Sequence, residues 1–367
     1  MKVYFPNLNS IRFIAALLVI IHHIEQFRDV FGLPNYYQHP VQIIGRLGVI
    51  LFFVLSGFLI TYLLLVEEKE TKQIDIKAFY IRRILRIWPL YYLILVLAFF
   101  IFPHINFFHV PGHEQTHWIM KIILFSIFLP NLVIAFGGGV AYASQAWSIG
   151  TEEQFYLIWP FLMKLVKNKL RLLLSILATY LAIKLALVHY SYNANFMTML
   201  KIWDLFCIDC MAIGGLFAIV WFNKYENVIL FLTHKATQLT VWVLTILLIA
   251  NGINFGFLHF EIYSIMFGII IFNLAVNTKS IVQFKNPIFD YLGKISYGLY
   301  MFHAIGIVVS IKIFMHFNIA ENIFIYPCSI LLTIILAHVS YNYFEKRFIK
   351  MKVKFSKVIS GDNALNE

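Results

Sequence analysis

The strongest constraint on this chain is a series of apolar segments, each close to the length of a bilayer-crossing helix. Such a helix needs about 20 residues. Eleven segments come near that length: 10–30, 46–66, 88–107, 119–136, 145–163, 171–189, 201–222, 236–254, 261–277, 295–315 and 322–344. Charged residues make up only 13% of the chain, about half of what a soluble domain carries. Most of the surface must therefore face an apolar medium. We predict an all-α fold, a polytopic integral membrane helical bundle.

The distribution of lysine and arginine predicts the orientation, because short cytoplasmic loops carry an excess of both. The basic residues gather in three stretches, 67–87, 164–171 and 346–357. Other connecting stretches contain none, namely 103–118, 189–200, 251–260 and 313–345. The net charge of +11 follows this pattern, which argues against a surface for nucleic acid. We expect both termini to be cytoplasmic and the protein to lie in the inner (plasma) membrane.

One stretch conflicts with a simple count of crossings. The stretches 67–87 and 164–171 should lie on the same side, so an even number of crossings must separate them, yet three apolar segments intervene. Irregular backbone at membrane depth is tolerated where protein buries it or where it lines a watery cavity. The run Gly137–Gly139 and the polar stretch Ser144–Gln154 suit such a re-entrant element. We predict about ten transmembrane helices plus a re-entrant or partial segment, with 119–136 and 145–163 both open as the full span.

No polar linker divides the chain, so we predict one membrane domain over residues 1–350 and a cytoplasmic C-terminal tail over residues 351–367. No internal repeat is evident either. A transporter built from inverted halves would show such a repeat.

The first apolar segment carries Arg12, His22 and His23. Arg12 and His23 are eleven positions apart, which is about 16 Å along a helix and close to three turns, so they share one face. Charged groups inside a span are costly and mark functional sites. An arginine here could hold an anion while the histidine acts deeper in the membrane. The alternative is that Arg12 snorkels to the headgroups and the histidines bond to neighbouring helices.

A second cluster consists of Arg82, Arg83 and Arg86, just before Trp88 and Pro89. Guanidinium groups match the geometry of phosphate oxygens, which favours a phosphate site. An interfacial anchor attracted to anionic lipid is the other interpretation.

Two adjacent carboxylates, Glu152 and Glu153, lie in an otherwise apolar stretch. A carboxylate there needs a partner such as a histidine or an arginine. A glutamate that orients a histidine would help that imidazole to activate a hydroxyl nucleophile. The alternative is that both carboxylates lie at the membrane edge.

The stretch from His113 to His117 matches the H-E-x-x-H pattern of zinc hydrolases. That chemistry needs a helix with both imidazoles on one face, and a third ligand. The stretch lies in a short loop without a larger catalytic framework. A solvated or substrate-contacting loop is the preferred interpretation, and we predict no metal site.

Five stretches occur together and in order: NLNSIRFIAALLVIIHH, GRLGVILFFVLSGFLITYLL, FYIRRILRIWPLYY, QAWSIGTEEQFYLIWP and ISYGLYMFH. With them the chain resembles the acyltransferase-3 family of membrane O-acyltransferases over nearly all of its length. The resemblance implies transfer of an acyl group, usually acetyl from cytoplasmic acetyl-CoA, to a hydroxyl of a cell-surface saccharide or a lipid-linked sugar. It therefore implies acyl-CoA as the donor substrate with no bound cofactor, and a saccharide or glycolipid acceptor.

The family pattern falls on particular residues. Its arginine and histidine, separated by ten residues, match Arg12 and His23, which selects His23 over His22. Its Trp-Ser-Leu pattern with a glutamate matches Trp147, Ser148 and Glu152, with Ile149 in place of leucine. The resemblance thus implies His23 and Glu152 as catalytic residues, and Arg12, Arg83, Arg86, Trp147 and Ser148 as substrate-binding or donor-binding residues. Further candidates are His22, Glu153, Tyr297 and His303.

Direct transfer and an acyl-histidine relay both remain open. Many relatives carry an extra extracytoplasmic hydrolase-like domain, whereas this chain ends about twenty residues after the last predicted span. We therefore expect the membrane domain or a separate partner to recognise the acceptor. Two other functions would fit parts of the pattern. A lipid-linked sugar flippase or transporter would move its substrate without consuming CoA, and a membrane zinc protease would bind metal and depend on Glu114.

Overall fold

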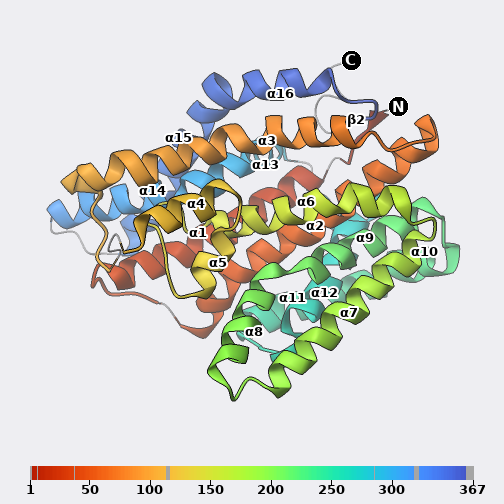
Figure 1. The fold of residues 1–367 in the computed structure, drawn as a ribbon, viewed down its shortest axis with the longest axis horizontal. Helices are drawn as coiled ribbons and strands as arrows, with labels where there is room; N and C mark the ends of the chain where they lie inside the picture. Colours follow the sequence, from red (N-terminus) through yellow and green to blue (C-terminus); the bar gives the residue numbers. More distant parts are fainter. Residues whose placement is uncertain are drawn as a thin grey trace.

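A computed structural model describes residues 2–5, 7–36, 38–112, 116–284, 286–317 and 322–360, and these are almost wholly α-helical (Figure 1). The long helices run roughly alongside one another, and the two ends of the chain lie close together at one side of the bundle. This confirms the predicted fold class, an all-α polytopic membrane bundle.

Among the described residues, eight helices are long and apolar enough to cross a membrane. They are α1 (Leu8–Val30), α2 (His39–Thr71), α3 (Ile76–Val96, extended to His104), α7 (Lys169–His189), α8 and α9 (Ala194–Phe206 and Ile208–Phe222), α12 (His259–Val276), α14 (Ser296–His316), and α15 (Asn322–Ser340) continued by α16 (Lys346–Val353). A ninth is the pair α10 (Glu226–Thr233) and α11 (Lys235–Ala250), which are bent by 57°. The sequence pattern suggested one continuous span over 236–254 instead.

The segment 119–136 forms two short helices, α4 (Trp118–Ser126) and α5 (Pro130–Ala135). At 1.5 Å per residue these rise only about 14 and 9 Å, so neither crosses the hydrocarbon alone. This is the partial segment. Helix α6 (Ala146–Leu165) has 20 residues and is therefore long enough to cross. Helix α6 is not one of the eight apolar helices counted above because the residues around Glu152 and Glu153 are polar. Counting α6, the described part of the chain holds nine or ten helices of spanning length.

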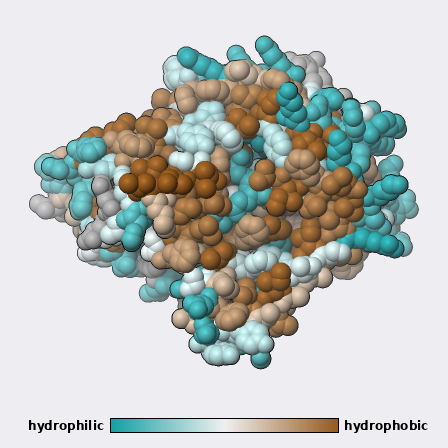
Figure 2. All heavy atoms as spheres, in the orientation of Figure 1, coloured by the Kyte–Doolittle hydropathy of each residue, from teal (hydrophilic) through white to brown (hydrophobic). Residues whose placement is uncertain are grey.

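The surface supports the same assignment. Figure 2 shows apolar residues across the middle of one face, and hydrophilic residues gathered at the side where the chain ends and α10 lie. The exposed apolar side chains include Leu157, Leu165, Leu230, Phe231 and Ile246. A continuous apolar surface of this kind suits lipid rather than water.

Helices α2 and α9 approach closely through glycines. A methyl group added at Gly57 would meet the Met211 carbonyl, and one added at Gly214 would meet the Val54 carbonyl. In a bilayer such small residues allow backbones to pack together, which supplies the attraction that lipid does not. This interface therefore fixes how α2, one wall of the site described below, sits in the bundle.

The last described residues fold back beside the first. Residues 346–360, here called the C-terminal strap, contain α16 and the two-residue strand β2 (Ile359–Ser360), which pairs in parallel with β1 (Lys2–Val3). Val358 packs with Val3 and Val66. The Arg82 Nη1 donates to the Phe355 carbonyl at 2.9 Å, and Lys357 Nζ lies 3.4 Å from an Asp75 oxygen. The strap is therefore fastened to the N-terminus and to the α2–α3 turn.

A buried ion pair closes the other end of α1. Arg28 Nη1 lies 2.8 Å from Glu25 Oε1, and both side chains are 0% exposed. The Tyr326 hydroxyl also donates to Oε1 at 2.8 Å, and the Tyr36 amide donates to the other oxygen. All of these contacts hold one carboxylate that has no access to water.

We expect Arg28→Met to lower the free energy of unfolding by about 3–5 kcal/mol, because it leaves the Glu25 carboxylate buried without its counter-charge. Unfolding of the purified protein in mixed micelles would measure this. Arg171→Met removes the same charge from an exposed position and should change stability by less than about 0.5 kcal/mol. Equal effects of the two substitutions would contradict the prediction.

Candidate active site

A cavity of about 280 Å³ opens between α1, α2, α3, α6 and α14. Its lining includes Tyr4 and Phe5 on one side and Ile349 and Lys352 of the strap on another. It therefore lies at the side of the bundle that holds the two ends of the chain. Six of the residues predicted from sequence line it: Arg12, Arg83, Arg86, Ser148, Glu152 and Tyr297.

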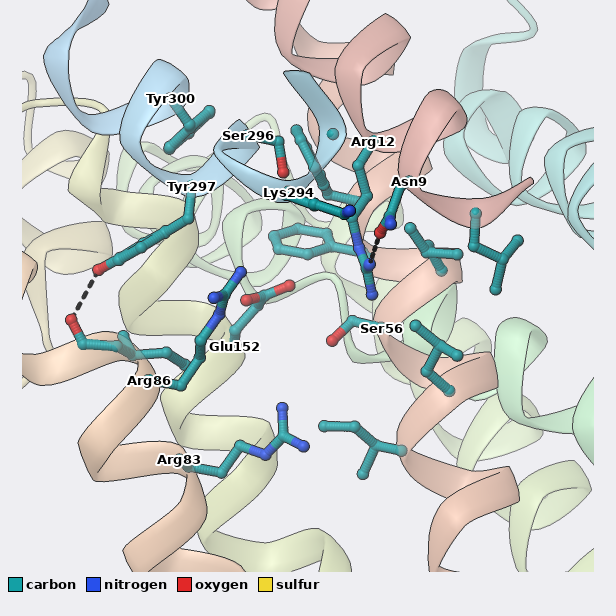
Figure 3. A pocket seen from close by; sticks show the side chains of 18 of the residues that line it. Asn9, Arg12, Ser56, Arg83, Arg86, Glu152, Lys294, Ser296, Tyr297 and Tyr300 are labelled. Atoms are coloured by element: carbon teal, nitrogen blue, oxygen red, sulfur yellow. Dashed lines mark hydrogen bonds between the residues drawn. The ribbon is translucent and has the colours of Figure 1, made fainter. Parts of the chain in front are cut away.

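The three arginines reach the cavity from two helices. In Figure 3, Arg12 extends from α1 and Arg83 and Arg86 extend from α3 toward the same space. Arg83 and Arg86 are three positions apart and so share a helix face. Arg12 Nη1 donates to Asn9 Oδ1 at 2.9 Å. The Arg83 guanidinium lies 5.5 Å from the centroids of the Phe79 and Tyr156 rings, which holds it in place by cation–π attraction.

The two adjacent glutamates point in different directions. Glu152 faces the cavity (Figure 3), with the hydroxyls of Ser56 and Tyr156 in hydrogen-bonding reach and Arg83 nearby. Glu153 instead accepts a 2.9 Å hydrogen bond from the indole Nε1 of Trp88. Successive residues of a helix point about 100° apart, so only Glu152 faces a ligand in the cavity.

Of the adjacent residues Trp147 and Ser148, again only one lines the cavity. The Ser148 and Tyr300 hydroxyls lie 2.7 Å apart, and both residues line the cavity. Trp147 is absent from the lining. Its ring lies 4.5 Å from the Arg46 guanidinium, which also contacts Phe260 at 4.8 Å. Trp147 thus holds Arg46 rather than facing the cavity.

The candidate histidines form a row behind the cavity. The ring of His23 lies 4.9 Å from that of His22 and 4.7 Å from that of His303. His303 in turn lies 5.8 Å from the Tyr300 ring, which lines the cavity. Moving away from the cavity, each ring therefore neighbours the next in the order Tyr300, His303, His23 and His22.

Glu152, for which we expected a histidine or an arginine as partner, lies near Arg83. Among the described residues, the hydrogen bond of the His23 ring joins Nδ1 to the Val19 carbonyl at 2.9 Å. A carbonyl only accepts, so Nδ1 must carry the proton. The Nε2 atom then keeps its lone pair, as a general base requires.

Sequence reasoning missed five residues that also line the cavity: Ser56, Tyr156, Lys294, Tyr300 and Lys352. Tyr300 belongs to the quoted stretch ISYGLYMFH and Lys294 directly precedes it, so that stretch was the available signal for these two. Lys352 was counted only as one of the basic residues near the C-terminus.

The H-E-x-x-H stretch lies mostly outside the described residues, because these exclude His113, Glu114 and Gln115. His117 precedes α4 with a φ of 52°. Within the part of the chain that the structure describes, no group of three or more histidine, cysteine, aspartate or glutamate side chains is arranged to hold a metal ion.

Comparison with known proteins adds to this geometry. The chain is 28% identical to a "Putative O-acetyltransferase" of Staphylococcus aureus (strain COL), over 96% of this chain and 58% of that protein. It is also 28% identical to the peptidoglycan O-acetyltransferase OatA of Listeria monocytogenes, over 93% of this chain and 55% of that protein. The chain thus spans little more than half the length of the curated relatives it matches. No solved structure matches it.

The model of one protein family, described as an acyltransferase domain, matches residues 5–341. This range includes every site residue predicted from the sequence and most of the bundle, but not Lys352. The chain therefore belongs to the acyltransferase-3 family, as its sequence stretches suggested.

Proposed function

We propose that the protein is a membrane O-acetyltransferase that moves acetyl from acetyl-CoA to a hydroxyl of a cell-surface saccharide. The observation that carries this proposal is the arrangement of the cavity. Its arginines suit the phosphates of the donor, and Tyr300 and His303 connect it to the His23 imidazole. The names of the relatives support the reaction class and favour a peptidoglycan or related envelope acceptor.

In this mechanism the donor enters from the cytoplasmic side, with its phosphates near Arg83 and Arg86 and its thioester toward His23. The His23 Nε2 atom takes the proton of the acceptor hydroxyl while the hydroxyl oxygen attacks the thioester carbonyl carbon. The carbon–sulfur bond then breaks, and the CoA thiolate recovers the proton from the imidazolium. Arg12 would stabilise the oxyanion or hold a donor phosphate. In the relay form, His23 Nε2 attacks the carbonyl first and the acceptor then takes the acetyl group.

The orientation follows from the same proposal. The cavity and the basic stretches 67–87 and 346–357 lie together, so both ends of the chain would face the cytoplasm. The acceptor would approach the histidine row from the opposite side of the inner membrane. A thiol-reactive or protease-based topology test would check the side on which the termini lie.

Arg83→Gln should raise the KM for acetyl-CoA at least tenfold with a smaller change in kcat, because it removes a charge that binds the donor before and during reaction. The assay is release of free CoA by protein in nanodiscs with a peptidoglycan-fragment acceptor. Arg171→Gln, at an exposed site, is the matched control. A wild-type protein that consumes no acetyl-CoA while moving a lipid-linked sugar across the bilayer would show a flippase instead.

A further inference from the structure

One lysine in the cavity lies among positive charges. Lys352 lines the main cavity and also a smaller neighbouring pocket that contains Arg82, Arg83 and Ser356. The charges near enough to act on it are all positive: those of Arg83, Arg86, Arg82 and Arg12. Among the described residues, the side chain of Lys352 makes no hydrogen bond and no ion pair with a carboxylate.

Four of the neighbouring cations differ in this respect, because each lies near a carboxylate. Lys294 Nζ lies 3.0 Å from an Asp290 oxygen, and Arg82 Nη2 lies 2.9 Å from a Glu67 oxygen. The charge of Arg86 acts on the Glu345 carboxylate, and those of Glu152 and Glu153 act on Arg83. Five cationic side chains therefore line the cavity against the single carboxylate of Glu152, and no carboxylate of the described chain is paired with Lys352.

Like charges gathered in a partly buried space repel one another, and folding alone gives no reason to bring a fifth cation there. A multiply charged anion would remove this repulsion on binding. A diphosphate with a further phosphate carries about four negative charges at neutral pH. Lysine and arginine together are the residues that bind such groups.

The strap that carries Lys352 is fixed rather than free. Its strand pairs with β1, the Arg82 guanidinium bonds to its Phe355 carbonyl, and Val358 is buried against Val3 and Val66. These contacts hold α16 across the cavity, so the position of Lys352 is set by the fold. The family match ends at residue 341, before the strap begins, so family membership does not assign it a role.

We infer that the C-terminal strap forms a wall of the donor site and that Lys352 binds a phosphate of a diphosphate-bearing ligand. The inference rests on the proposed function for the identity of that ligand as acyl-CoA. The same chemistry is present in the headgroup of a diphosphate-linked lipid, and the experiment separates these sources.

The test is calorimetric titration of the full chain in detergent with coenzyme A, and separately with farnesyl diphosphate. Lys352→Gln should weaken binding of coenzyme A about tenfold and reduce its dependence on salt concentration, because one phosphate contact is lost. Lys350→Gln removes the same charge from an exposed site on the same helix and should change affinity less than twofold. Lys352→Arg keeps the charge and should stay within about threefold of wild type. Melting temperatures confirm that each variant folds.

Each outcome decides the question. Equal affinity in Lys352→Gln and wild type would overturn the inference and leave the proposed function intact, as would equal losses in the Lys352 and Lys350 variants. Binding of farnesyl diphosphate alone, weakened by Lys352→Gln, would support the strap as a wall of the site but refute acetyl-CoA as its donor. A wild-type protein that binds neither ligand overturns the inference, while the CoA-release assay judges the proposed function separately.

Discussion

Replacing His23 with alanine is expected to reduce acetyl transfer about a thousandfold, with the protein still folded. The loss follows from the mechanism, because His23 is the residue assigned to take the hydroxyl proton, and general base catalysis contributes about 10²–10⁴-fold. The effect should fall on kcat, while the affinity for CoA stays near that of wild type, since His23 does not line the cavity. Transfer of labelled acetyl from acetyl-CoA to a peptidoglycan fragment, by protein in nanodiscs, measures the rate.

His316→Ala is the matched control, because this histidine is exposed at the far end of α14 and should leave the rate within twofold of wild type. Full turnover by His23→Ala would refute the assigned role. Label that wild-type protein takes up without acceptor, that acid or hydroxylamine releases readily, and that is lost in His23→Ala, would favour the acyl-histidine relay over direct transfer.

The second large effect concerns stability. Gly214→Ala should lower the free energy of unfolding by about 3 kcal/mol, because the new methyl group meets the Val54 carbonyl, and neither backbone can move without separating α2 from α9. The substitution would also weaken binding in the cavity, since α2 forms one wall of it. Thermal unfolding in detergent, followed by tryptophan fluorescence, gives the change in stability.

The neighbouring residue offers the control. A methyl group at Gly215 would lie 3.0 Å from Thr61 Oγ1 and 3.2 Å from a Leu173 methyl, so it meets ends of side chains, which can shift by a few tenths of an ångström, and no backbone atom. Gly215→Ala gains helix propensity of about 1 kcal/mol and should therefore be close to neutral. A similar melting temperature for both variants would show that the α2–α9 contact does not set the stability.

The fold class could be predicted from the sequence because lipid imposes a simple requirement. A spanning helix must be long and apolar, and both properties are local. The bend between α10 and α11 could not be predicted in this way, because the apolar pattern continues on both sides of His234. The requirement for an even number of crossings between 67–87 and 164–171 did indicate a partial segment, and α4 and α5 form that segment.

The site was predictable in part. Arg12, Arg83, Arg86 and Glu152 were named from sequence, but their convergence on one cavity depends on how α1, α3 and α6 pack. The sequence left a histidine and an arginine both open as the partner of Glu152, because that choice depends on packing: Arg83 lies near Glu152, whereas the His23 ring faces His303. Lys352 was hidden among the basic residues that fix the orientation of the protein, and only the return of the strap to the cavity distinguishes it.

The pairing of β1 with β2 also bears on how the protein is made. Residues 2–3 leave the ribosome before every described membrane helix, whereas residues 359–360 follow all of them. Contacts between such distant segments form late, because a long loop must close before they contribute. During synthesis the bundle can assemble while the mouth of the cavity is still open. The proposed donor site would then be complete only after the last described helix has entered the bilayer, so a nascent chain would not bind the donor fully before that helix is inserted.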